Sequence, residues 1–188
     1  QKITDMNITF PHTIDNGHGE RLTFVDLVKE PDGDKLIVEG VCQPKAGPPM
    51  HVHFKQDEGF TVTKGKIAYQ MLNGEEKILE EGQSVVFKKG EAHRFWNAGE
   101  GEAVLKGYVK PANTIAFFLS SMYDAQKRGK NGRPDDFDAA YLMTRYKSEY
   151  DMLELPAFVK KVIIPMTYQI GKLRGKYKKF SDAPAPIK

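Results

Sequence analysis

The sequence has very little cysteine and no long hydrophobic run. Cys42 is the only cysteine among 188 residues, which excludes an internal disulfide and a cysteine-rich metal site. The longest apolar stretches, such as residues 162–166, are far shorter than the roughly 20 residues of a membrane-spanning helix. We therefore expect a soluble chain that does not cross a bilayer. The chain starts at Gln1, so a cytoplasmic location and export followed by removal of a signal both stay open.

The charge of the chain is unevenly distributed. Hydrophobic residues make up 40% and charged residues 28% of the sequence, as in a globular protein of about one domain. Residues 156–188 carry eight basic residues and one acid, a net charge of +7, whereas the rest of the chain carries −4. Any contact with anionic lipid or nucleic acid is therefore expected at the C-terminus. No nucleic-acid motif accompanies this charge, so we expect no nucleic-acid partner.

Up to Pro111 the sequence has the pattern of a mainly β protein. Short β-branched or aromatic runs alternate with turn signals, which favours many antiparallel strands. Asn73-Gly74 between two such runs predicts a hairpin, because both central residues of the favoured two-residue turn need positive φ. About eight short strands without intervening helices predict a barrel or jelly roll. The predicted strands cover residues 22–28, 36–41, 59–63, 66–71, 77–79, 84–87, 93–97 and 103–109.

After Pro111 the apolar residues follow helical spacing. A first helix is predicted from residue 113 or 114 to about 128, and a second from 134 or 135 to near 153. A third is predicted from 156 to about 170, kinked or broken at Pro165, and residues 183–186 are expected to form an extended, frayed end. The sequence thus predicts a barrel domain over residues 1–111 and a helical extension over residues 112–188, packed on the barrel or on a partner subunit.

Three histidines and one glutamate have the spacing of a metal site. His51 and His53 are two residues apart, so on a strand both side chains project from the same face. Glu58 can follow on the next stretch of strand, and His93 lies on another predicted strand. Imidazole and carboxylate together suit one divalent transition metal, which can be Fe, Mn, Ni, Cu or Zn. With these four ligands, an octahedral ion keeps two positions for water, O2 or substrate.

At these residues the sequence resembles the cupin superfamily. The first cupin motif has two histidines with one residue between them, then a glutamate and a glycine, and it is matched by His51, His53, Glu58 and Gly65. The second motif is matched by Gly82, Gly90, His93 and Asn97. Lys88 stands where the family has a proline, and Gly47 lies nearer to His51 than the motif prescribes. The resemblance covers residues 36–109, and motifs of this joint length are far more specific than a single short one.

The resemblance implies a fold and a range of functions. The implied fold is a double-stranded β-helix with the metal inside, commonly in a homodimer. Similar proteins include dioxygenases, oxalate-metabolising enzymes, sugar-phosphate isomerases, epimerases and non-enzymatic binding proteins, so the fold alone does not define the chemistry. We expect a metal-dependent oxidoreductase of dioxygenase type acting on a small aromatic or enolic molecule. A small-molecule binding or sensing protein and a sugar isomerase or epimerase are the alternatives.

Further residues around the motifs have candidate roles. Besides being a metal ligand, Glu58 is the candidate catalytic base, since a carboxylate can take a proton from an enol or hydroxyl group. An aromatic-rich substrate pocket is predicted from Met50, Gln56, Phe60, Tyr69, Phe95 and Trp96. In the basic segment 158–174 we favour a helix that packs its apolar side on the barrel or on a partner subunit over one that rests on anionic lipid.

Overall fold

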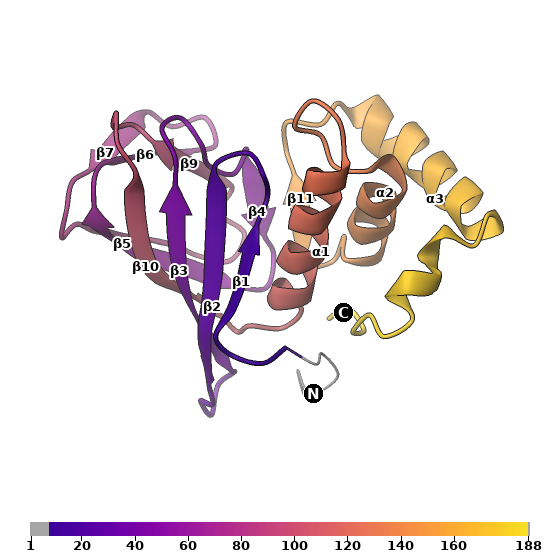
Figure 1. Cartoon of the computed structure of the whole chain (residues 1–188), viewed down its shortest axis with the longest axis horizontal. Coiled ribbons are helices and arrows are strands. Elements are labelled where there is room, and N and C mark those ends of the chain that lie inside the picture. Colours follow the sequence, from indigo (N-terminus) through magenta and orange to yellow (C-terminus); the bar gives the residue numbers. More distant parts are fainter. Residues whose placement is uncertain (1–7, 188) are drawn as a thin grey trace.

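Two antiparallel sheets form a jelly roll, and helices follow it in the chain (Figure 1). The computed structural model describes residues 8–187. The first sheet has the order β1 (His12–Asp15), β2 (Glu20–Val28), β3 (Lys35–Cys42), β10 (Ala103–Lys110), β5 (Asp57–Lys64) and β8 (Ser84–Phe87). The second has the order β11 (Tyr150–Met152), β4 (His51–His53), β9 (His93–Asn97), β6 (Ile67–Met71) and β7 (Glu76–Leu79). This architecture confirms the predicted fold class.

The predicted strands are present with small differences at their ends. All eight have a counterpart whose bounds lie within two residues of the prediction. The hairpin at Asn73-Gly74 also forms, between β6 and β7, but its turn differs from the predicted one. Asn73 has a φ of 60° and the Gly74 amide donates to the Met71 carbonyl oxygen at 2.9 Å, whereas Gly74 is not in the left-handed region. The hairpin therefore does not use a two-residue turn with two positive φ angles.

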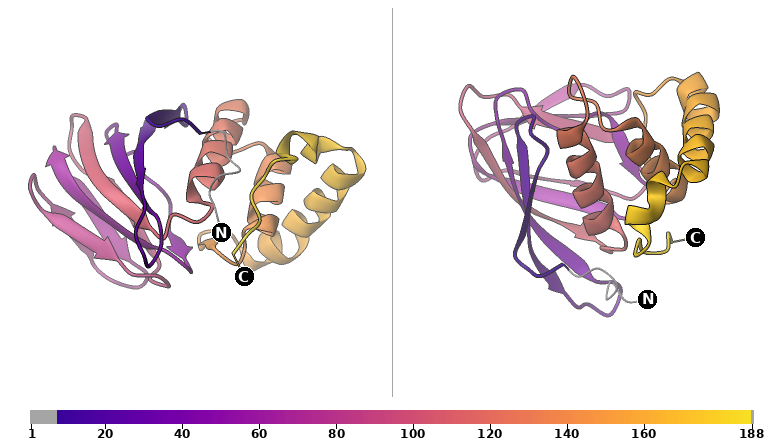
Figure 2. Two further views of the ribbon diagram at one scale, coloured as in Figure 1. Left: turned by 90° about the horizontal axis from the view of Figure 1, so that it is seen from below. Right: turned by 45° about the vertical axis from the view of Figure 1, so that its right-hand side comes forward.

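The helices lie to one side of the jelly roll (Figure 2). They are α1 (Ile115–Arg128), α2 (Asp136–Arg145), the π-helical turn η2 (Val159–Ile163), α3 (Ile164–Leu173) and the 3-10 turn η3 (Lys176–Phe180). Asp135 caps α2, because its side chain accepts hydrogen bonds from the Phe137 and Asp138 amides. At the break predicted near Pro165, the chain changes from π-helical to α-helical winding just before the proline. Pro165 lies in the first turn of α3, where the missing N–H of a proline is tolerated. Among the helices of residues 8–187, none combines the length and the hydrophobicity that crossing a membrane requires.

The second helix ends earlier than the sequence pattern predicts. α2 ends at Arg145, and the chain then contributes the short strand β11, whose Tyr150 pairs with His53 of β4. Tyr150 is buried and lies against Phe118 of α1, with ring centroids 4.5 Å apart. Pairing with an open sheet edge therefore overrides the helical pattern of this segment. Since β11 extends a sheet of the jelly roll, the division at residue 111 stays a prediction.

The C-terminal tail is docked, so the expectation of a frayed end was wrong. The Tyr146 hydroxyl donates to the Pro184 carbonyl oxygen at 2.9 Å, and the Ser148 hydroxyl donates to that of Ile187 at 2.7 Å. The Ile187 amide donates to the buried carboxylate of Glu149 at 3.0 Å. These bonds hold the tail against the segment between α2 and β11.

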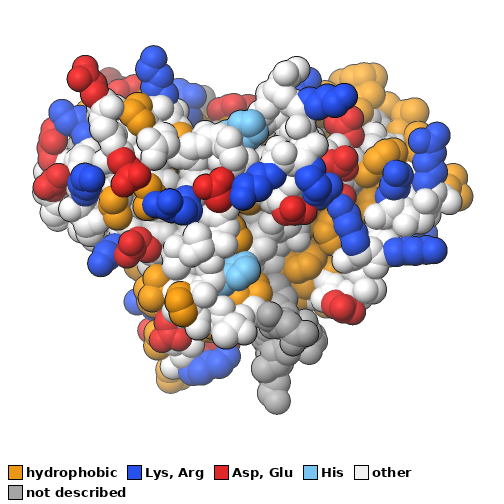
Figure 3. Space-filling model, viewed as in Figure 1, with side chains coloured by type: hydrophobic (Ala, Val, Ile, Leu, Met, Phe, Trp, Pro, Cys, Tyr) orange, Lys and Arg blue, Asp and Glu red, His pale blue; other side chains and the backbone are white. Residues whose placement is uncertain are grey.

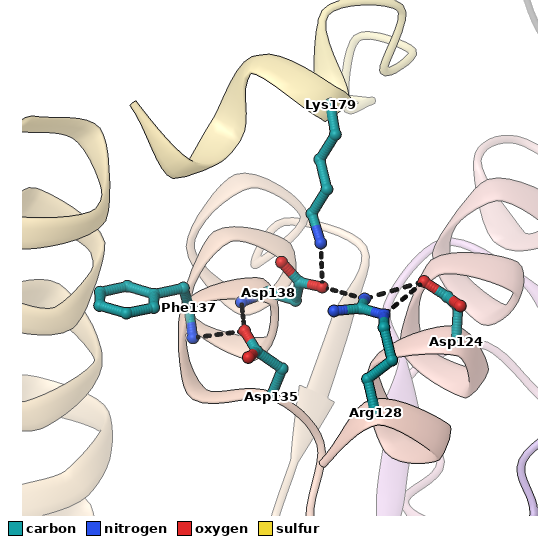
Figure 4. Close-up of polar contacts among 6 residues, drawn as sticks. All are labelled: Asp124, Arg128, Asp135, Phe137, Asp138 and Lys179. Atoms are coloured by element: carbon teal, nitrogen blue, oxygen red, sulfur yellow. Dashed lines mark hydrogen bonds and ion pairs between the residues drawn. The ribbon is translucent and has the colours of Figure 1, made fainter. Parts of the chain in front are cut away.

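One buried carboxylate connects α1, α2 and η3 (Figure 4). The side chain of Asp138 is only 2% exposed, and it accepts hydrogen bonds from Arg128 of α1 and from Lys179 of η3. Arg128 also pairs with Asp124 at 2.8 Å, one turn earlier on the same helix. Because Asp138 is buried and receives both cations, we infer that it contributes more to the helical packing than the exposed Asp124 does.

We expect Asp138→Asn to lower the free energy of unfolding by about 1.5–3 kcal/mol, since two charge-assisted hydrogen bonds lose their anionic acceptor. Urea denaturation followed by circular dichroism measures this change. Asp124→Asn is the matched control, with an expected loss of less than about 0.5 kcal/mol because its carboxylate is mostly exposed. Equal effects of the two substitutions would contradict this account.

Candidate metal centre

Four side chains from both sheets meet at one point inside the jelly roll. His51 and His53 lie on β4 and His93 on β9, and His51 is directly opposite His93 in the sheet register. Glu58 lies on β5, in the other sheet. Its Oε2 atom is 3.7 Å from His51 Nε2, 3.4 Å from His53 Nε2 and 3.3 Å from His93 Nε2. The structure thus places all three imidazoles within 3.7 Å of the Glu58 carboxylate. The ligand atoms of His51, Glu58 and His93 also lie within 4.8 Å of one another, as one metal ion requires.

The orientation of two imidazoles suits metal coordination. His51 Nδ1 lies 2.8 Å from the Pro49 carbonyl oxygen, and His93 Nδ1 lies 2.9 Å from that of Glu91. A carbonyl oxygen only accepts, so each Nδ1 donates a proton to it and each Nε2 atom faces the centre, where the neutral form of the ring offers a lone pair to a metal. Such an outer hydrogen bond is the usual way in which proteins orient a metal-binding histidine. The donor set and its orientation therefore fit a divalent transition metal.

The third imidazole, His53, is held by packing. Among residues 8–187, no hydrogen-bond partner reaches its buried Nδ1 atom. The ring instead lies edge-on to Tyr150 of β11, with centroids 5.4 Å apart. His93 has a similar apolar support, since Phe87 stacks on it almost in parallel at a centroid distance of 3.7 Å. The sequence pattern contains no signal for the contact with Tyr150, because β11 falls within a predicted helix.

The four side chains differ in their access to solvent. Glu58 and His51 are 17% and 13% exposed, whereas His53 and His93 are 9% and 1% exposed. Glu58 and His51 therefore form the side of the cluster that a small molecule can approach from water. Glu20, for which the sequence predicts no role, has a carboxylate that accepts hydrogen bonds from Asn16 at 2.8 Å and from Tyr123 at 3.3 Å. Burial raises the pKa of Glu20, and its charge raises that of His51.

The electrostatics of the cluster favour an ionised carboxylate. Burial by itself raises the pKa of Glu58, but hydrogen bonds with His51 and His93 outweigh it and hold that pKa well below 4.5. Burial, together with the neighbouring His51 and His93, lowers the pKa of His53 to about 3. For His51, burial opposes protonation, yet the contact with Glu58 leaves its pKa above 6.5. In the metal-free protein the contact between the two side chains thus favours the ionised form of Glu58 and the protonated form of His51.

The aromatic residues that are predicted to line a pocket lie on two different faces of the sheet. Phe60 and Phe95 are buried in the interior, with ring centroids 4.8 Å apart, and Tyr69 lies edge-on to Phe87 beside them. Trp96 lies on the opposite face of β9 from His93, because neighbouring strand residues alternate, and Arg94 on that outer face covers its ring. Trp96 therefore does not share the interior with the histidines. The prediction that it lines the pocket was wrong.

Gln56 and Met50 are buried, and the side chain of Gln56 is hydrogen-bonded away from the cluster. The Gln56 side-chain amide donates to Glu149 at 2.9 Å and to the Tyr150 hydroxyl at 3.1 Å. Glu149, which is fully buried, also accepts from Thr114 at 2.9 Å. Met50 precedes β4, and its amide donates to the Glu154 carboxylate at 3.1 Å. Gln56 and Glu149 thus form a polar connection between the jelly roll and the helices, which sequence reasoning missed because its members are far apart in the chain.

We expect Glu58→Gln to lower the pKa of His51 in the chelator-treated protein, because Glu58 is the main group that counteracts the effect of burial. The imidazole proton signal of His51, followed by NMR between pH 4 and 9, measures this change. Asp57→Asn, one residue away in a solvent-exposed ion pair with Lys88, is the matched control and should leave the titration unchanged. An unaltered His51 titration in Glu58→Gln would show that the two groups are not coupled.

Comparison with known proteins is consistent with this geometry. Residues 39–109 match the family model described as the cupin domain. Among curated proteins, the probable oxidoreductase virH of Hypocrea virens is 26% identical over 95 residues, which are 46% of this chain and 43% of that protein. The oxidoreductase iacF of Pestalotiopsis fici is 29% identical over 84 residues, 41% of each protein. The matches thus span less than half the length of these relatives.

Solved structures are similar to part of this chain at low sequence identity. One is a sugar phosphate isomerase of the cupin superfamily from Silicibacter pomeroyi, with a TM-score of 0.41 and 20% identity. The match covers 48% of this chain and 59% of that one.

Proposed function

Because residues 39–109 match the cupin domain, we propose that this protein is a metal-dependent cupin oxidoreductase of dioxygenase type. The proposed metal ligands are His51, His53, Glu58 and His93, and the proposed substrate is a small aromatic or enolic molecule. The observation that carries the proposal is the convergence of three imidazole Nε2 atoms within 3.7 Å of one carboxylate oxygen. The names of the two curated relatives, both oxidoreductases, support the reaction class.

The residues of the centre have complementary proposed roles. A bound divalent transition metal supplies Lewis-acid polarisation of a substrate oxygen and redox chemistry with O2. His51 and His93 hold their Nε2 atoms in place through the backbone carbonyls of Pro49 and Glu91. Glu58 is the proposed acceptor of the proton that an enol or phenol substrate loses, because a carboxylate in contact with the substrate can act as a general base. Its position on the more exposed side of the cluster supports contact with a substrate.

The surroundings of the centre support an apolar, planar substrate. Phe60, Tyr69 and Phe95 place aromatic rings in the same interior as the histidines, where they exclude water and favour ring-shaped molecules. We retain Met50 as a buried neighbour of His51, and we leave Gln56 and Trp96 out of the proposed pocket because of the contacts described above. The homodimer that the resemblance implies stays a prediction.

We expect the protein purified without chelator to contain about one Fe, Mn, Ni, Cu or Zn ion per chain, and we expect His51→Ala/His93→Ala to lose it. Elemental analysis by mass spectrometry measures the content. His12→Ala/His18→Ala is the matched control, because it removes two histidines that lie outside the cluster. Metal that is absent from the wild type, or that is retained equally in the cluster variant, would refute the ligand assignment.

We expect oxygen consumption when flavonols, catechols and enediols are screened as substrates with an oxygen electrode. Glu58→Gln should lower kcat by about 100-fold or more, the usual contribution of a general base, and chelation should abolish the uptake. Substrate conversion that proceeds at the same rate under nitrogen would identify an isomerase instead. Tight ligand retention without any turnover would identify a binding protein.

A further inference from the structure

The outer face of α3 exposes a continuous row of large apolar side chains. The row extends over η2 and α3 and consists of Phe158, Val162, Ile163, Met166, Ile170 and Leu173. Its members recur mostly every four residues, which aligns them along one side of the helix. Exposure reaches 65% at Phe158, 56% at Met166 and 88% at Leu173. α3 is the outermost element of the helical part, on the side away from the jelly roll (Figures 1 and 2).

The opposite face of α3 is the one that packs. Gly171 is buried there, and a side chain at this position would collide with Tyr177 and Phe137. Tyr168 stacks on Tyr177 at a centroid distance of 5.3 Å. The interior contacts of α3 are thus satisfied by α2 and η3, and the apolar outer face is not covered by any part of residues 8–187. The packing on the barrel that the sequence analysis favoured does not occur for this face.

Unpaired cations flank the outer face of α3. Within residues 8–187, no ion pair forms with Lys161 of η2, Lys172 of α3 or Arg174 at the end of α3, and all three are exposed. Lys176 and Lys178 lie on η3, where the Lys176 ammonium is 5.6 Å from the centroid of the Phe137 ring. Lys160 and Lys179 differ, since they pair with Asp151 and Asp138. Basic and apolar side chains alternate at this end of the molecule (Figure 3). In the part of the chain that the structure describes, the segment therefore combines apolar surface with positive charge that no acidic side chain pairs with.

We propose that the outer face of α3 rests on an anionic lipid surface. Its apolar side chains would enter the boundary between headgroups and acyl chains, and the surrounding lysines would contact the headgroup phosphates, as in amphipathic helices that lie in the membrane interface. A second copy of this chain is a less suitable partner. A symmetric contact between two α3 faces would bring two sets of unpaired cations together, and like charges repel. The proposal is independent of the metal centre.

Co-sedimentation with vesicles tests the proposal on the full chain. We expect binding at least tenfold tighter to vesicles of phosphatidylcholine with 30% phosphatidylserine than to pure phosphatidylcholine. Met166→Glu/Ile170→Glu should abolish the binding. Ile78→Glu/Val86→Glu is the matched control, because it places the same charges on equally exposed apolar residues of β7 and β8, and it should bind like the wild type.

A second variant tests the electrostatic part. Lys161→Gln/Lys172→Gln should bind the anionic vesicles about 25-fold more weakly, since each lysine near such a surface contributes roughly fivefold. Metal content and circular dichroism should match the wild type in every variant, which separates this test from that of the metal centre. Absent vesicle binding, or equal binding to neutral and anionic vesicles, would overturn the proposal. So would a dimer that Met166→Glu/Ile170→Glu dissociates without any loss of lipid binding.

Discussion

The burial of one ionised carboxylate among three imidazoles is the constraint on which the centre of this structure depends. A carboxylate in a largely apolar interior is costly unless charged or hydrogen-bonding partners compensate it. Glu58 comes from one sheet and its histidine partners from the other, so the compensation requires that both sheets keep their register. The pairing of His51 with His93 places two of these partners side by side. A shift by one residue in β4 or β9 would turn imidazoles away from the carboxylate.

The helical extension supports the same region from outside the jelly roll. β11 completes the edge of the sheet next to β4, and its Tyr150 packs against His53. Glu149, the residue before it, is fully buried and collects hydrogen bonds from Gln56, Thr114 and the amide of Ile187. Residues from the jelly roll, from the start of α1 and from the C-terminal tail therefore meet at one carboxylate. The position of His53 is thus coupled to the packing of a segment that follows the jelly roll by about 40 residues.

The two ends of the molecule use charge differently. Near the jelly roll, carboxylates are inside and paired, as at Glu58 and Glu149. At the far end, Asp138 is also buried and paired, but Lys161, Lys172 and Arg174 are exposed, have no ion-pair partner among residues 8–187 and lie next to the exposed apolar face of α3. The first arrangement creates an interior of defined shape and protonation state, which suits chemistry on a small molecule. The second creates a surface of amphipathic character, which suits contact with an extended partner.

The strands and the four-residue cluster could be predicted from the sequence because their signals are local. Alternation along a strand places His51 and His53 on one face, and turn residues delimit β8 and β9 closely. The same alternation places Trp96 and His93 on opposite faces of β9. Only the tertiary structure decides which of these faces becomes the interior. The segment around Tyr150 has a helical pattern, but it forms the strand β11 because it pairs with the open edge of β4. The docking of the tail on Glu149 and the exposure of the outer face of α3 were likewise decided by tertiary structure. Both depend on contacts between segments that are distant in the chain, and neither composition nor periodicity encodes which segments meet.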